Sequence, residues 1–170
     1  MRKEMFEHEI TILRDTFGRL LRRHAHINLT KLINKTHAAD LAVLFRYFSD
    51  EEQSQVFALI GENEHTAEFL VELDDTLLAN LLKDETPERI SGLIEHASAN
   101  DQSYILGTLE EDQAQSVIDL LKKEEQEEIE ELMGYPEDSA GAMMTTDIFT
   151  LYQDTPCRDA LKTLQDHGEA

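Results

Sequence analysis

The sequence predicts an all-α protein, built as a superhelical array of short antiparallel helices. Apolar residues recur every twelve positions: Leu21, Ile33, Phe45, Phe57, Phe69, Leu81, Leu93, Ile105, Val117 and Ile129. A continuous α-helix turns about 100° per residue, so a step of twelve would rotate the apolar site by roughly 120° each time. Because no apolar face would persist along one long helix, the chain is expected to turn after every repeat.

Helix-breaking and helix-capping residues fall between these apolar positions, at intervals of twelve or thirteen: Ser49, Gly61, Asp74, Thr86, Ser98, Glu110, Lys122 and Gly134. The run Ser49-Asp50-Glu51-Glu52 has the form of a capping box. Thr86-Pro87-Glu88 places a capping residue before a proline at the first helical position. Each unit is therefore predicted to be a helix of about nine residues and a tight turn, which stacking must stabilise.

The first element, residues 1–26, is predicted to be an amphipathic leading helix. Its apolar residues recur at three- and four-residue steps, as Phe6, Ile10, Leu13, Phe17, Leu20 and Leu21. It holds six basic and four acidic side chains, whereas the rest of the chain is strongly acidic. We interpret it as a cap on the acidic helices that follow; contact with a membrane surface or a partner is the alternative.

The charge and the missing motifs limit the possible functions. The 15 basic and 36 acidic residues give a net charge of −21, which repels nucleic acid and anionic membrane surfaces and makes cations the natural partners. The sequence has no glycine-rich phosphate loop and no nucleophile elbow, and Cys157 has no base beside it. We therefore predict that the chain is not an enzyme. With a single cysteine and no run of about 18 apolar residues, it is expected to be soluble and cytoplasmic.

Carboxylates predominate among the candidate metal ligands. Glu124, Glu127, Glu128 and Glu131 share one face of a predicted helix, which is either a solvated surface or a region that attracts cations. Carboxylates without cysteine clusters or paired histidines suit hard ions such as Mg²⁺ or Ca²⁺. The sequence leaves the preference among Mg²⁺, Ca²⁺ and Mn²⁺ open.

The helical pattern stops at a junction, residues 135–145, which reads Tyr135-Pro136-Glu137-Asp138-Ser139-Ala140-Gly141-Ala142-Met143-Met144-Thr145. Pro136 and Gly141 both break helices, so this segment is predicted to be a hinge. A short strand is expected over 147–151, followed by a helix over 155–164 with Thr155 as its cap and Pro156 at its first position.

This junction resembles the link between the N-terminal helical domain and the first CBS domain of the MgtE magnesium transporters. The segment 66–73, Thr-Ala-Glu-Phe-Leu-Val-Glu-Leu, is similar to part of the family's helical array. The resemblance implies a right-handed superhelix over 1–134, of a shape also found in armadillo and FliG-type proteins, and the beginning of a truncated α/β CBS domain over 146–170. It also implies that the chain is a fragment and that its tail lacks the partners it would pack against.

By the same resemblance, the chain is expected to be the cytosolic regulatory domain of an integral membrane Mg²⁺ transporter or channel. Acidic surfaces would bind intracellular Mg²⁺ weakly, close against CBS domains and gate the pore, with the intact protein forming a homodimer. Glu68 and Glu88 fall at acidic positions of the family, whereas Gly92 stands where some relatives carry a carboxylate. The remaining ligands would come from outside this chain.

One alternative belongs to a different class. The chain could be an acidic helical-repeat scaffold for protein interactions, FliG-like in shape and without a metal-sensing role. In that case the acidity would serve solubility or docking to a basic partner. The following part of the gene would distinguish the two, through the presence or absence of a CBS pair and membrane spans.

Overall fold

The computed structural model describes residues 2–136, 139–141, 144 and 150–167, and within them every regular element is an α-helix. The helices are α1 (Arg2–Arg22), α2 (His26–Ile33), α3 (Ala38–Phe45), α4 (Asp50–Phe57), α5 (Glu64–Val71), α6 (Asp75–Leu82), α7 (Pro87–Ile94), α8 (Ala99–Gly107), α9 (Glu111–Ile118), α10 (Lys123–Met133) and α11 (Cys157–His167). The helices from α2 to α9 span eight or nine residues each, which confirms the predicted array of short units.

All ten apolar residues of the twelve-residue repeat are buried, none of them more than 9% exposed. They join one continuous core that runs through the superhelix. In this core Phe45 and Phe69 lie with their ring centroids 4.8 Å apart, and Phe48 packs against both Phe17 and Phe45 at 5.7 Å. The spacing read from the sequence thus identifies the residues that hold successive helices together.

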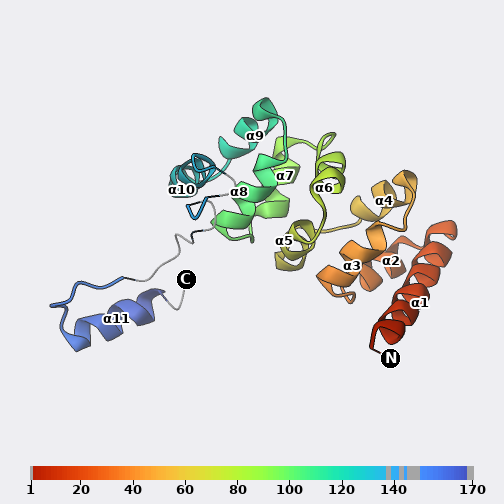
Figure 1. Cartoon of the computed structure of the whole chain (residues 1–170), viewed down its shortest axis with the longest axis horizontal. Helices are drawn as coiled ribbons and strands as arrows, with labels where there is room; N and C mark the ends of the chain where they lie inside the picture. Colours follow the sequence, from red (N-terminus) through yellow and green to blue (C-terminus); the bar gives the residue numbers. More distant parts are fainter. Residues whose placement is uncertain (1, 137–138, 142–143, 145–149, 168–170) are drawn as a thin grey trace.

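Many of the helices from α3 to α10 pack against the next but one in the chain (Figure 1). Thus α3 contacts α5, α5 contacts α7 and α7 contacts α9, while α4 lies against α6 and α8 against α10. The leading helix α1 packs on α2 and α3. This stacking supplies the stability that helices of two turns lack in isolation.

The predicted caps mostly begin helices. The side chains of Ser49, Asp74, Thr86 and Ser98 each accept the backbone N–H of the residue three positions later. Glu110 begins α9 without a side-chain cap bond. Before α5 the cap is Asn63, two residues after the predicted turn residue Gly61. There the Asn63 side chain accepts the Thr66 N–H, and the Thr66 hydroxyl donates to the Gly61 carbonyl at 2.6 Å.

Glutamine side chains connect several helices to the turn that precedes them. In α4, α8 and α10 a glutamine four residues after the cap donates Nε2 to the carbonyl of Phe45, Ala97 or Leu121 respectively. In α9 Gln113 reaches farther and donates to the carbonyls of Leu82 and Glu85. These bonds satisfy carbonyl groups left without helical partners at the preceding helix ends or in the turns.

Replacing Ser49 with alanine is expected to lower the free energy of unfolding by about 1 kcal/mol, because it removes the capping box of α4. Urea denaturation followed by circular dichroism measures this loss. Ser54→Ala in the same helix is the matched control, since the exposed Ser54 hydroxyl only donates to the Asp50 carbonyl within the helix. Equal losses in the two variants would contradict the assigned role of the cap.

The C-terminal part follows α10, which ends at Met133 with Gly134 as its C-cap. A Cβ atom at Gly141 would overlap the Tyr135 ring, so the glycine permits a close approach within the junction. Residues 137, 138, 142, 143 and 145 of the junction lie outside the described residues, as do 147–149 of the expected strand, and the described Thr150 and Leu151 are not in a strand. The expected helix is present as α11, beginning one residue after Pro156.

Within the described residues, no helix combines the length and the apolar character that crossing a membrane would require.

Candidate functional site

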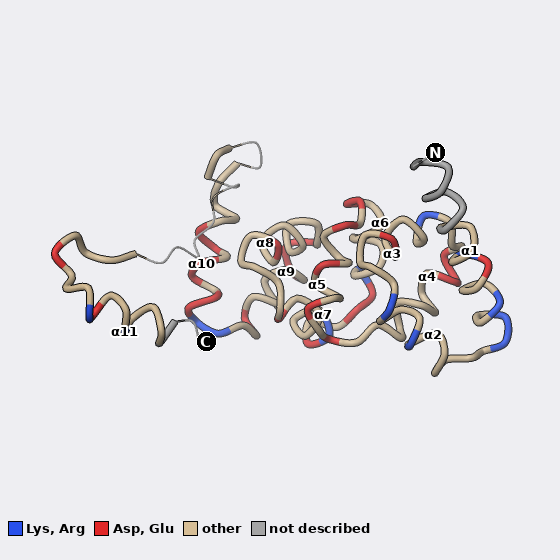
Figure 2. The backbone as a smooth tube through the Cα atoms, turned by 90° about the horizontal axis from the view of Figure 1, so that it is seen from below, with Lys and Arg blue, Asp and Glu red and all other residues tan. Residues whose placement is uncertain are grey.

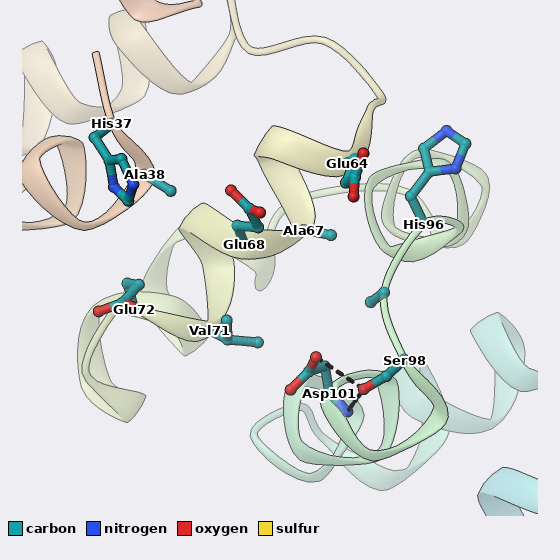
Figure 3. A pocket seen from close by; sticks show the side chains of 11 residues that line it. His37, Ala38, Glu64, Ala67, Glu68, Val71, Glu72, His96, Ser98 and Asp101 are labelled. Carbon is teal, nitrogen blue, oxygen red and sulfur yellow. Dashed lines mark hydrogen bonds between the residues drawn. The ribbon is translucent and has the colours of Figure 1, made fainter. Parts of the chain in front are cut away.

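An acidic groove of about 350 Å³ lies along α5, between the start of α3 and the turn that joins α7 to α8 (Figure 3). Its charged and titratable lining side chains are His37, Glu64, Glu68, Glu72, His96 and Asp101. One of the two predicted metal ligands, Glu68, therefore lies in a groove, in the middle of α5.

The periodicity of the α-helix explains why three carboxylates of α5 face this groove. Glu64, Glu68 and Glu72 are four residues apart and share one face of the helix, while Phe69 and Leu70 are buried on the other. All three glutamates are exposed, and none of them forms an ion pair within the described part of the chain. Like charges at this spacing repel by a few tenths of a kcal/mol per pair, so a bound cation would stabilise this face.

Asp101 faces the groove from α8. Its carboxylate accepts a hydrogen bond from the Ser98 hydroxyl at 2.8 Å, and the same hydroxyl accepts the Asp101 N–H at 3.2 Å (Figure 3). Asp101 is thus fixed by the cap of its own helix, whereas the α5 carboxylates are free to turn toward a ligand. Sequence reasoning did not single out Asp101, because the stacking of α5 on α8 brings it to this groove.

Glu88, the second predicted ligand, lies elsewhere. It is an exposed residue in the first turn of α7, just after the Thr86 cap, and it does not line the acidic groove. Glu68 and Glu88 therefore do not share the acidic groove.

The space beside Gly92 is filled by a carboxylate from another part of the chain. A Cβ atom at Gly92 would lie 2.6 Å from the carboxyl carbon of Glu62. Arg89 holds that carboxylate with an Nη1–Oε1 distance of 3.0 Å and donates Nη2 to the Ile60 carbonyl at 2.6 Å. The sequence gives no sign of this arrangement, because Glu62 and Arg89 are 27 residues apart and belong to different repeats.

The donor set limits what the acidic groove can do chemically. Among the described residues, no group of three or more His, Cys, Asp or Glu side chains is placed to hold a metal ion. Mg²⁺ usually keeps several of its water molecules and binds through one or two protein carboxylates. The α5 carboxylates fit that mode of binding. A hydrated Mg²⁺ ion held only by these carboxylates would need further ligands to bind tightly.

Acidic residues also predominate on α10, where the tube in Figure 2 is largely red. Part of this charge is compensated locally, because Lys123 pairs with Glu127 at 3.6 Å and the Tyr135 hydroxyl donates to Glu131 at 3.4 Å. The acidic residues of this helix are thus better paired than those of α5.

A second groove, of about 610 Å³, lies where α6, α8 and the end of α10 meet, and Tyr104, Met133 and Tyr135 contribute to its lining. The Tyr104 hydroxyl donates to the Asp75 carboxylate at 2.6 Å. Burial, and then this hydrogen bond to Asp75, raise the pKa of Tyr104 to about 12. The phenol therefore stays protonated at neutral pH and does not act as an acid or a base there.

Comparison with solved structures shows the fold. The chain is similar to "Crystal structure of the cytosolic domain of the Mg2+ channel MgtE in complex with ATP", with 24% identity and a TM-score of 0.78 over 92% of this chain and 64% of that one. It is also similar to "Crystal structure of the soluble part of a magnesium transporter", with 18% identity and a TM-score of 0.71 over 94% of this chain and 63% of that one. The chain thus spans less than two thirds of either structure. A search of curated protein sequences gives no match.

The sequence itself establishes the family. A family model described as the MgtE intracellular N domain matches residues 36–138, which include the helices from α3 to α10 and both predicted ligands. This match agrees with the resemblance seen at the junction and with the prediction that the chain is not an enzyme. The chain belongs to the MgtE intracellular N domain family.

Proposed function

We propose that this chain is the cytosolic regulatory domain of a Mg²⁺ transporter or channel, and that it senses intracellular Mg²⁺ through its acidic surfaces. The observation that carries the proposal is the exposed row of Glu64, Glu68 and Glu72 in the groove of a domain from this family. The row is unpaired within the described part of the chain, and its ligand type suits a hard divalent ion.

The physical basis is repulsion between acidic surfaces. Two unit charges about 6 Å apart at an effective dielectric near 20 repel by roughly 3 kcal/mol before screening. If this domain closes on a second acidic domain, divalent ions must bind between them to offset that repulsion. When the Mg²⁺ concentration falls, the domains separate, so differential ion binding shifts the population between a closed and an open arrangement.

The proposal extends to the segments beyond the array. Residues 146–170 would begin a CBS domain, and residues 135–145 would be the link about which the helical domain moves. The partners would be the CBS and transmembrane parts of the same protein, on the cytoplasmic side of the membrane, in a homodimer. Those parts would supply the ligands that complete the sites at Glu68 and Glu88.

Titration of the chain with Mg²⁺ tests the metal-binding part of this proposal. We expect weak binding, with a dissociation constant on the order of 1 mM or weaker, because a hydrated Mg²⁺ ion meets only one or two carboxylates here. Backbone amide shifts in NMR spectra report the site, and the largest changes are expected on α5. Glu68→Gln should reduce the shifts on α5 several-fold, whereas Glu88→Gln should reduce those at the start of α7.

Glu130→Gln on α10 is the matched control, since it removes one exposed carboxylate outside the groove. It should leave the response of α5 unchanged. Tight stoichiometric binding that survives Glu68→Gln would contradict the assignment of Glu68. Absence of any Mg²⁺-dependent change on α5 would instead favour the acidic scaffold for protein interactions.

A further inference from the structure

A groove of about 420 Å³ lies at the N-terminal end of the superhelix, and three arginines contribute to its lining. We call it the arginine groove; it is lined mainly by Arg14, Arg19 and Arg22 of α1, Tyr47 and Phe48 of the turn after α3, and Glu52 of α4. Figure 2 shows basic residues gathered at this end, near α1 and α2. The groove is separate from the acidic groove along α5, with which it shares no lining residue.

Two carboxylates also line the arginine groove, and both have partners. Asp15 pairs with the neighbouring Arg14 at 3.5 Å. Glu52 accepts the backbone N–H of Ser49 at 3.0 Å, as part of the capping box of α4. These two negative charges therefore each have a local partner.

Arg19 and Arg22 form no ion pair within the described part of the chain, although acidic residues outnumber basic ones by 36 to 15. Both side chains are exposed and border the same groove. The Arg22 side chain lies against Gly18. A Cβ atom added at Gly18 would be 3.3 Å from Nη1 of Arg22. A side chain larger than hydrogen at position 18 would crowd this guanidinium group, so the glycine leaves room for it at the groove.

Tyr47 adds an exposed aromatic ring to the groove. It is 58% exposed, while the adjacent Phe48 is buried against Phe17 and Phe45. The anchored Phe48 fixes the turn between α3 and α4, and so holds the Tyr47 backbone beside the arginines. A solvent-exposed tyrosine next to unpaired guanidinium groups provides one surface for a planar ring and another for an anion.

From this arrangement we propose that the arginine groove binds a small phosphorylated ligand that carries an aromatic ring, such as a nucleotide. Guanidinium groups bind phosphate oxygens in pairs of parallel hydrogen bonds, which makes Arg19 and Arg22 the phosphate-binding residues. Tyr47 stacks on the ring of the ligand.

The net charge argues for a small ligand rather than an extended anionic surface. Charges farther away than the Debye length, about 8 Å at physiological ionic strength, are largely screened. A ligand confined to the groove meets three arginines and two carboxylates in the lining, and both carboxylates already have local partners. A membrane or a nucleic acid would also approach the acidic helices, and a chain of net charge −21 repels it.

Isothermal titration calorimetry of the whole chain in metal-free buffer with EDTA tests the proposal, with ADP, pyrophosphate and adenosine as probes. ADP is expected to bind, pyrophosphate to bind several-fold more weakly, and adenosine not to bind. The Arg19→Gln/Arg22→Gln double variant should weaken ADP binding at least tenfold, and Tyr47→Leu should reduce it to the level of pyrophosphate. Circular dichroism and thermal unfolding confirm that these exposed substitutions leave the fold intact.

Lys31→Gln/Lys35→Gln is the matched control, because it removes two exposed positive charges from the same end of the molecule outside the groove. It should change ADP affinity less than twofold. An equal loss in this control would show general charge attraction and overturn the proposal, as would the absence of ADP binding up to millimolar concentration. Binding to vesicles that contain phosphatidylinositol phosphates, with none to ADP, would also overturn it. The absence of metal separates this result from the test of Mg²⁺ sensing.

Discussion

Replacing Phe69 with alanine is expected to lower the free energy of unfolding by about 3–5 kcal/mol, because it leaves a cavity in the centre of the core. Phe69 is fully buried, and its ring lies 4.8 Å from that of Phe45, so the substitution also removes an aromatic pair. Urea denaturation followed by circular dichroism measures the loss. A helical array whose units are too short to fold alone is expected to depend strongly on such a contact.

A double-mutant cycle with Phe45→Ala isolates the ring–ring interaction. The two losses should be non-additive by about 0.5–1.5 kcal/mol, the usual strength of an aromatic pair beyond its buried area. Tyr152→Ala is the control, since that ring is 87% exposed and its removal should change stability by less than about 0.5 kcal/mol. A loss below about 1.5 kcal/mol for Phe69→Ala would show that stacking of the repeats does not depend on this residue.

Arg89→Met is expected to lower the free energy of unfolding by about 1.5–3 kcal/mol, the range for hydrogen bonds that involve a charged group. The guanidinium donates to the Ile60 carbonyl at 2.6 Å and pairs with Glu62, and so connects the turn before α5 to α7. Methionine keeps most of the apolar stem, so the loss reports the polar contacts. The measurement is again urea denaturation.

Two further variants separate the contributions at this position. Glu62→Gln removes only the ion pair, whose acidic member is about half exposed, and should cost less than about 1 kcal/mol. Arg46→Met is the matched control, because the Arg46–Asp74 pair spans 3.8 Å with both side chains more than half exposed, and its loss should be below about 0.5 kcal/mol. Equal effects at positions 46 and 89 would refute the role assigned to the Ile60 carbonyl.

The fold could be predicted closely because its signals are local. The twelve-residue spacing cannot be accommodated by one helix, and the caps at Ser49, Asp74, Thr86 and Ser98 act within a single turn of chain. The turn expected at Gly61 is present, and the cap of α5 is a polar side chain two residues later, Asn63. Both glycine and asparagine favour turns, and the Thr66 hydroxyl also donates to the Gly61 carbonyl there.

The candidate site was only partly accessible to the sequence. Glu68 could be singled out through the family resemblance, and its place beside Glu64 and Glu72 follows from helical spacing. Asp101 could not, because it reaches the groove only when α8 stacks on α5. The roles of Glu68 and Glu88 as Mg²⁺ ligands stay predictions until the titrations are made.

The sequence by itself determined the helical repeat, the residues of its core and the family to which the chain belongs. These depend on periodicity and capping, which act over a few residues, and on a motif read directly from the chain. The tertiary structure alone decided which side chains from different repeats meet: Glu62 beside Gly92, Asp101 across from α5, and Arg19 and Arg22 with Tyr47. The reason is physical, because the direction in which each short helix leaves its turn depends on how the whole core packs.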